Sequence, residues 1–142
     1  DEREGGLRRV LNFGHTVGHA IEHATHFTTY RHGEAVALGM VASLVASVDA
    51  GTCTQALAER VHRLLVALGL PTELPADLDR ALVRAALTHD KKRAAAGVRF
   101  ILCAGPGQYA EQWLQLDAIP LERPSSSMVP GKTKSAAPLH KD

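Results

Sequence analysis

The sequence has few aromatic residues, little net charge and no long hydrophobic run. Phe, Tyr and Trp make up 4% of its 142 residues, and the formal net charge is +1 at pH 7. So small a charge gives no electrostatic reason to expect binding to nucleic acid or to a membrane surface. No apolar stretch reaches the roughly 18–20 residues that a transmembrane helix needs. We therefore expect a globular protein, and the abundance of Ala and Leu favours helices over a β-sandwich.

Cysteine and nucleotide-binding motifs are also scarce. The two cysteines, Cys53 and Cys103, do not form a CxxC pair. This spacing indicates buried small side chains in a reducing compartment, so we expect the cytoplasm and leave a disulfide open. No Gly-rich phosphate loop occurs, so a nucleotide would have to bind to chain that is not present here. The sequence opens without Met inside a charged helical pattern, and we expect a piece of a longer protein.

The periodicity predicts a mainly α protein with one small β-hairpin. Helices are expected over residues 4–26, 33–50, 54–68 and 77–89, the second of them buried on all sides. Thr54 and Asp77 are the expected N-caps of the last two helices. Residues 98–102 and 109–114 read as strands joined by a Gly-Pro-Gly turn. We expect one domain over 1–121 and a disordered tail over 122–142, which is rich in Pro, Ser and Lys.

Histidines are the most informative residues, because five of the eight fall between positions 15 and 32. On a helix, successive residues are rotated by roughly 100°, and six polar residues therefore fall within one arc of about 80°. All six side chains can bind a metal or form hydrogen bonds. These are Glu4, Arg8, Asn12, His15, His19 and Glu22. A further histidine, His32, opens the next helix, so the pattern predicts a metal or substrate site. Imidazoles with a carboxylate suit Zn²⁺ or Co²⁺ better than Mg²⁺.

Other residues near this arc have simpler interpretations. Gly14 and Gly18 each precede a histidine and cost helix propensity, so we expect them to permit close approach of a ligand or another backbone. His23, His26 and His62 are interpreted as surface or core residues without a ligand. The Asp-Lys-Lys sequence at 90–92 is either a solvated helix end or an anchor for a phosphate or carboxylate.

The run from Glu4 to Glu22, with its Asn-Phe-Gly-His-Thr-Val-Gly-His segment, and the His32-Gly33-Glu34 opening resemble the 3-dehydroquinate synthase family. The resemblance covers about residues 1–116, which correspond to the helical C-terminal domain of that family. It implies a carbon–oxygen lyase of the shikimate pathway, which leads to the aromatic amino acids. Such an enzyme converts 3-deoxy-D-arabino-heptulosonate 7-phosphate to 3-dehydroquinate and phosphate, using NAD and a zinc or cobalt ion.

The resemblance also implies roles for individual residues. His15 and His32 match the two metal histidines, and the third ligand, a glutamate, comes from the N-terminal NAD domain, which is absent here. The substrate-contacting positions are Glu4, Arg8, Asn12, His19 and one of Lys91 and Lys92, with Lys91 favoured. His19 would assist phosphate elimination, and Asn12 would act with it. The fragment alone should be inactive and bind metal weakly, and a homodimer of the full enzyme remains open.

Two alternatives stand beside this interpretation. The first is a related sugar phosphate cyclase such as 2-deoxy-scyllo-inosose synthase. The intact Gly-His-Ala-Ile-Glu segment at 18–22 argues against the valiolone-type cyclases but does not exclude every relative. The second alternative is a non-catalytic helical remnant that binds a partner or a metal.

Overall fold

The computed structural model describes residues 12–88 and 97–122 of the chain. The elements, in chain order, are α2 (His15–Ala24), α3 (His32–Asp49), α4 (Gln55–Ala67), α5 (Arg80–Leu87), β1 (Val98–Gly105), β2 (Gln108–Leu114) and a short 3-10 helix (Leu116–Ala118). This arrangement confirms the mainly α fold with a small hairpin. In the described part of the chain, no helix is long and apolar enough to cross a membrane. Of the tail expected over 122–142, residues 123–142 lie outside the described part of the chain.

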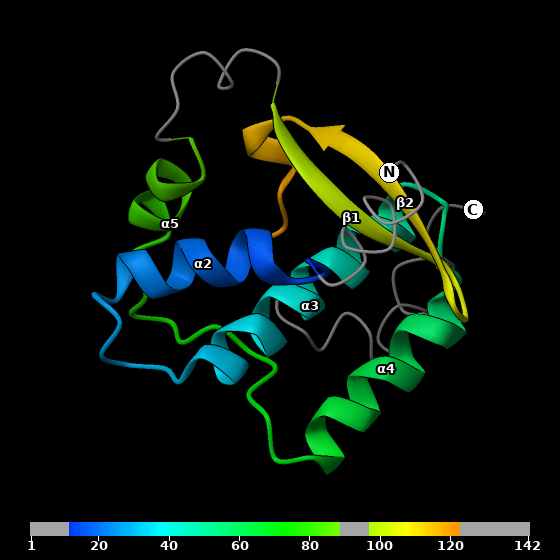
Figure 1. The fold of residues 1–142 in the computed structure, drawn as a ribbon, viewed down its shortest axis with the longest axis horizontal. Helices are drawn as coiled ribbons and strands as arrows, with labels where there is room; N and C mark the ends of the chain where they lie inside the picture. Colours follow the sequence, from blue (N-terminus) through cyan, green and yellow to red (C-terminus); the bar gives the residue numbers. More distant parts are fainter. Residues whose placement is uncertain (1–11, 89–96, 123–142) are drawn as a thin grey trace, which may run out of the picture.

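Helix α3 is the centre of the fold, with the other elements arranged around it (Figure 1). It is buried along most of its length, as its apolar sequence predicts. Helix α2 packs across it on one side, and β1 and α4 pack elsewhere along it. Ala35 and Leu38 of α3 share one core cluster with Val17 and Ile21 of α2 and with Phe100 of β1. The core therefore fixes α2 and the hairpin relative to α3.

Glycines let α2 and α3 approach each other closely. A Cβ added at Gly39 of α3 would collide with the carbonyl oxygen of Gly14 and lie 2.8 Å from the Gly18 nitrogen. A Cβ at Gly18 would lie 3.1 Å from the carbonyl oxygen of Ala35. The expectation that Gly14 and Gly18 permit the approach of another backbone is thus confirmed. The third glycine, Gly39, was not identified from the sequence.

The predicted helix over 4–26 is too long. Residues 12–14 form a turn, and Gly14 has a φ of 81°, a left-handed conformation that ends any continuous helix at this point. Helix α2 therefore begins at His15. It ends at Ala24, because His26 and Phe27 also have positive φ values. Residues 4–11 lie outside the described part.

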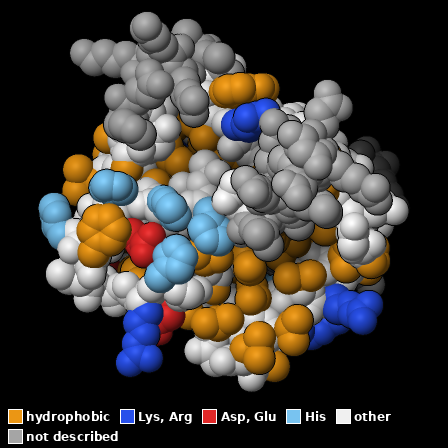
Figure 2. Space-filling model, in the orientation of Figure 1, with side chains coloured by type: hydrophobic (Ala, Val, Ile, Leu, Met, Phe, Trp, Pro, Cys, Tyr) orange, Lys and Arg blue, Asp and Glu red, His pale blue; other side chains and the backbone are white. Residues whose placement is uncertain are grey.

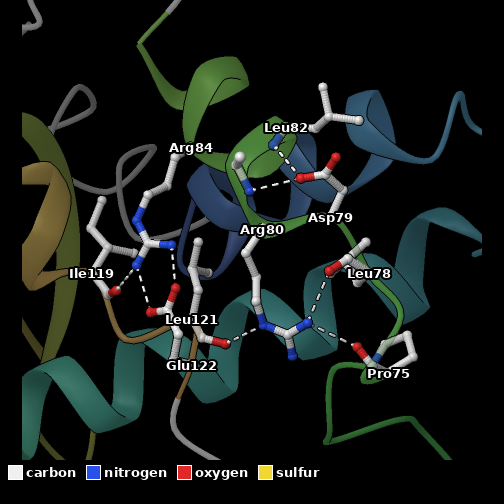
Figure 3. Close-up of polar contacts among 10 residues, drawn as sticks. Pro75, Leu78, Asp79, Arg80, Leu82, Arg84, Ile119, Leu121 and Glu122 are labelled. Carbon is white, nitrogen blue, oxygen red and sulfur yellow. Dashed lines mark hydrogen bonds and ion pairs between the residues drawn. The ribbon is translucent and has the colours of Figure 1, made fainter.

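The caps of the later helices are partly as predicted. The Thr54 hydroxyl oxygen accepts a hydrogen bond from the Leu57 N–H at 3.1 Å, which confirms Thr54 as the N-cap of α4. The cap of α5 is Asp79 rather than Asp77. Its carboxylate accepts the Ala81 N–H at 3.0 Å and the Leu82 N–H at 3.2 Å, because it stands directly before the first helical turn (Figure 3).

The chain after β2 returns to α5 and is held there by two arginines (Figure 3). The Arg84 guanidinium donates to both carboxylate oxygens of Glu122, at 2.6 and 2.7 Å, and to the Ile119 carbonyl oxygen at 3.1 Å. Arg80 donates to the Leu121 carbonyl oxygen at 3.2 Å. Ile119 and Leu121 are buried in the core, so the arginines satisfy the backbone polar groups that this burial removes from water.

Candidate functional site

Helices α2 and α3 bring three of the histidines together. His15 is the first residue of α2, His19 lies one turn later, and His32 is the first residue of α3. One ligand nitrogen from each ring lies within 4.8 Å of the others. Figure 2 shows histidine side chains gathered on one face of the molecule, with an acidic side chain among them. The structure therefore groups His19 with the two histidines that were predicted to bind a metal.

The geometry of the three rings fits a metal ion. The ring centroids of His15, His19 and His32 are 5.3–5.8 Å apart, and the rings are tilted relative to each other. Ligand nitrogens of a tetrahedral zinc site lie about 2.0–2.1 Å from the ion, hence roughly 3.3 Å apart. His19 and His32 are exposed, so small rotations of their side chains would bring the nitrogens to this separation. The residues present therefore fit a site for a borderline metal ion such as Zn²⁺ or Co²⁺.

Two of the rings are oriented through Nδ1. The Nδ1 atom of His32 lies 3.1 Å from Oε2 of Glu22 on α2. The Nδ1 atom of His15 lies 3.4 Å from the carbonyl oxygen of Phe13, a long contact. Both partners are acceptors, so each contact favours the tautomer with its proton on Nδ1 and leaves Nε2 as a potential ligand. Sequence reasoning placed Glu22 on the histidine arc but assigned it no role; its position one turn after His19 was the available signal.

The start of α3 is fixed locally. The Arg31 backbone N–H donates to Oε1 of Glu34 at 2.8 Å, which satisfies an N–H group ahead of the first turn. The same carboxylate lies at the positive end of the helix dipole. His32 therefore stands on a well-defined first turn rather than on a loose loop.

An apolar hollow of about 510 Å³ adjoins His15 between α3, α4 and the tip of the hairpin. Its walls include Phe13, Met40, Leu57 and Ile101. Apolar walls beside a polar site lower the local dielectric and strengthen the electrostatic interactions within it. His15 thus has apolar walls on one side.

Of the remaining predicted site residues, Asn12 is among the described residues and the others are not. Asn12 is exposed in the turn before α2 and lines a hollow of about 270 Å³ together with Thr16, Leu87 and Gly97. Leu87 and Gly97 flank in sequence the segment that carries the predicted lysines. These lysines, Lys91 and Lys92, lie outside the described residues, as do Glu4 and Arg8.

The histidines that were interpreted as lacking a ligand are not members of the three-histidine cluster. His23 is exposed, and its ring contacts Phe27 with centroids 5.1 Å apart. His26 is exposed in the loop after α2. His62 is buried on α4, and burial lowers the pKa of its imidazole. Among the described residues, its Nε2 atom has no hydrogen-bond partner.

Comparison with known proteins identifies relatives for most of the chain. The family model described as "3-dehydroquinate synthase C-terminal" matches residues 1–93. The chain is 55% identical over 109 residues to the 3-dehydroquinate synthase of Citrifermentans bemidjiense, covering 77% of this chain and 30% of that protein. It is 48% identical over 108 residues to the enzyme of Synechocystis sp., with coverages of 76% and 30%. The chain thus spans about 30% of the length of these relatives.

Solved structures of a related cyclase have the same fold. A crystal structure of 2-deoxy-scyllo-inosose synthase complexed with carbaglucose-6-phosphate, NAD⁺ and Co²⁺ matches with a TM-score of 0.66 and 25% sequence identity, covering 82% of this chain and 33% of that one. A second structure of that synthase matches with a TM-score of 0.65 at the same identity, with coverages of 76% and 31%. The family model, the close relatives and the shared fold agree, and the chain belongs to the 3-dehydroquinate synthase family, in which it corresponds to the C-terminal domain.

Proposed function

We propose that this chain is the metal- and substrate-binding part of a 3-dehydroquinate synthase. The proposed reaction converts 3-deoxy-D-arabino-heptulosonate 7-phosphate to 3-dehydroquinate and phosphate, as a carbon–oxygen lyase of the shikimate pathway. The observation that carries the proposal is the cluster of His15, His19 and His32, whose ligand nitrogens lie within 4.8 Å of one another in a member of this family. The fragment alone is expected to be inactive, and the cytoplasmic location stays a prediction.

His15 and His32 are the proposed protein ligands of a Zn²⁺ or Co²⁺ ion. When bound, such an ion acts as a Lewis acid that polarises a substrate oxygen. The contacts of the two rings at Nδ1 support this assignment, because they leave Nε2 of each ring as the ligand atom. The NAD site and the third protein ligand are proposed to come from the remaining part of the enzyme.

His19 and Asn12 are the proposed substrate-side residues. His19 is exposed, and its ring lies next to the two proposed ligands, so it could hold a proton for the departing phosphate. Asn12 could donate and accept hydrogen bonds at a substrate hydroxyl. Glu4, Arg8 and Lys91 are proposed to bind further polar groups of the substrate, with Arg8 offering a planar fork for an anionic oxygen pair.

The test is a chimera in which this chain replaces the matching part of the Citrifermentans bemidjiense relative. With NAD⁺ and Co²⁺ it should release phosphate from 3-deoxy-D-arabino-heptulosonate 7-phosphate and form 3-dehydroquinate. Alanine at His15 or His32 should abolish turnover, whereas alanine at the exposed His23 should leave it unchanged. Full activity of the His15→Ala or His32→Ala chimera would refute the metal assignment.

The likeness to 2-deoxy-scyllo-inosose synthase supports a second candidate, a related sugar phosphate cyclase. The same chimera separates the two, because a cyclase of that second kind should bind carbaglucose-6-phosphate, the compound in the solved structure, and form no 3-dehydroquinate. A folded chimera that binds metal but neither sugar phosphate would support the non-catalytic remnant.

A further inference from the structure

Glu22 follows His19 of the histidine cluster by three residues, and its carboxylate is buried. Only 8% of the residue is exposed, although it lies on α2 between the surface histidines His19 and His23. Moving a carboxylate out of water costs several kcal/mol unless it is paired and hydrogen-bonded. Exposing the carboxylate to solvent would avoid this cost. Its burial therefore indicates that the side chain does more than make the surface of the helix polar.

The partner of this carboxylate is the His32 ring. Oε2 of Glu22 and Nδ1 of His32 are 3.1 Å apart, and the contact joins α2 to the first residue of α3. The His32 side chain itself is 59% exposed, whereas that of Glu22 is 11% exposed. The buried carboxylate therefore restrains the exposed ring, because an exposed side chain on a first helical turn would otherwise sample several rotamers.

The contact has a definite consequence for the ring. An ionised carboxylate only accepts hydrogen bonds, so Nδ1 of His32 must carry the donated proton. In the neutral ring the lone pair then lies on Nε2. The same contact restricts rotation of a ring whose centroid lies 5.3 Å from that of His15 and 5.8 Å from that of His19.

We infer that Glu22 is a positioning residue that fixes the tautomer and orientation of His32 for metal binding through Nε2. The inference rests on the metal site of the proposed function. Carboxylates that hold a ligand histidine in this way raise its basicity and preorganise the site, and their removal costs roughly 10–100-fold in metal affinity. Glu22 itself does not bind the ion.

The first experiment needs no variant and no metal. In the metal-free 142-residue chain, ¹⁵N NMR of the neutral His32 ring should show the proton on Nδ1, whereas a histidine free in solution favours Nε2. A His32 ring protonated at Nε2 in the folded wild-type chain would overturn the inference. This result would leave the proposed reaction untouched, because His32 could still bind metal through the other nitrogen.

The second experiment measures metal affinity in the chimera of the proposed function, which supplies the third proposed ligand, by titration with Co²⁺ followed by visible absorption. Glu22→Leu removes the acceptor at similar volume and should weaken binding roughly 10–100-fold. Glu22→Gln keeps an acceptor oxygen but removes the charge, so its loss should be smaller. Both variants should shift the His32 ring towards the Nε2-protonated tautomer, an effect that a purely structural role would not produce.

Glu34→Gln is the matched control. It removes the same charge two residues from His32, but the Glu34 carboxylate binds the Arg31 N–H and not the ring. Equal losses for Glu22→Leu and Glu34→Gln would reduce the effect to general electrostatics and overturn the inference. A wild-type chimera with no Co²⁺ affinity, beside a 142-residue chain whose His32 is protonated at Nδ1, would instead count against the proposed metal site.

Discussion

Replacing Gly39 with alanine should disrupt the crossing of α2 and α3 on which the histidine cluster depends. The added Cβ would collide with the carbonyl oxygen of Gly14 and lie 2.8 Å from the Gly18 nitrogen. These are backbone atoms, so no side-chain rotation can relieve the overlap. The helices must separate, or the turn before His15 must move.

The expected loss follows from two opposing terms. Alanine in the interior of a helix is favoured over glycine by about 1 kcal/mol. Overpacking of a well-packed interface costs typically about 1–3 kcal/mol, and here the obstruction is rigid, which favours the upper end. We therefore expect a net destabilisation of about 1–2 kcal/mol for Gly39→Ala. Displacement of His15 relative to His32 should also weaken binding of Co²⁺.

Gly33→Ala on the same helix provides the control. A Cβ at Gly33 would meet nothing within 4 Å, so this variant should be neutral or gain up to about 1 kcal/mol. Urea denaturation followed by circular dichroism measures both free energies of unfolding, and Co²⁺ titration measures both affinities. If Gly39→Ala is as stable as Gly33→Ala and binds Co²⁺ as well as the wild type, the close crossing does not exist as described.

Three further predictions concern other parts of the fold. Arg84→Gln should destabilise the chain by about 1 kcal/mol, because it removes the ion pair with the largely exposed Glu122 and the hydrogen bond to the Ile119 carbonyl oxygen. Thermal melts measure this loss, and an unchanged melting temperature would contradict it. The pKa of His62 is lowered in the fold by burial, so the unfolded state binds the extra proton first, and stability should fall as the pH drops below about 6.5. A His62→Gln variant should lose less stability than the wild type between pH 7 and 5, and equal slopes would refute the assignment. Burial and the neighbouring Cys103 raise the pKa of Cys53 to about 11. Alkylation of Cys53 by iodoacetamide at pH 8 should therefore be much slower in the folded chain than in the urea-unfolded chain. Similar rates in the two states would disprove the burial of this thiol.

The sequence predicts well what depends on local pattern. The buried helix α3 and the hairpin follow from an apolar run and from a change of period, and both are found close to their expected positions. The cap at Thr54 follows from the preference of a hydroxyl for the first free N–H groups. In these cases the residues that determine the local structure lie within a few positions of it in the chain.

One wrong helix boundary and one missed residue share a physical cause, which is that the deciding contact lies elsewhere in the chain. A histidine arc continuous over residues 4–22 predicts one helix, but Gly14 takes a left-handed φ where its backbone meets Gly39. Glu22 looks like another polar member of the arc until the fold places His32, ten residues later, against its carboxylate. Periodicity along one helix contains no information about which residue of a neighbouring helix it will meet.

The way each ring is held separates His19 from the other two histidines. His15 and His32 each have an acceptor at Nδ1, as expected for rings that must present Nε2 in a fixed direction. Within residues 12–88 and 97–122, His19 makes ring contacts with both but no hydrogen bond that fixes its tautomer. A group that exchanges a proton with a substrate benefits from such freedom, whereas a metal ligand loses affinity by it. This difference agrees with the proposal that His15 and His32 are the metal ligands and that His19 faces the substrate. Co²⁺ affinity should then fall sharply for His15→Ala and His32→Ala and only slightly for His19→Ala.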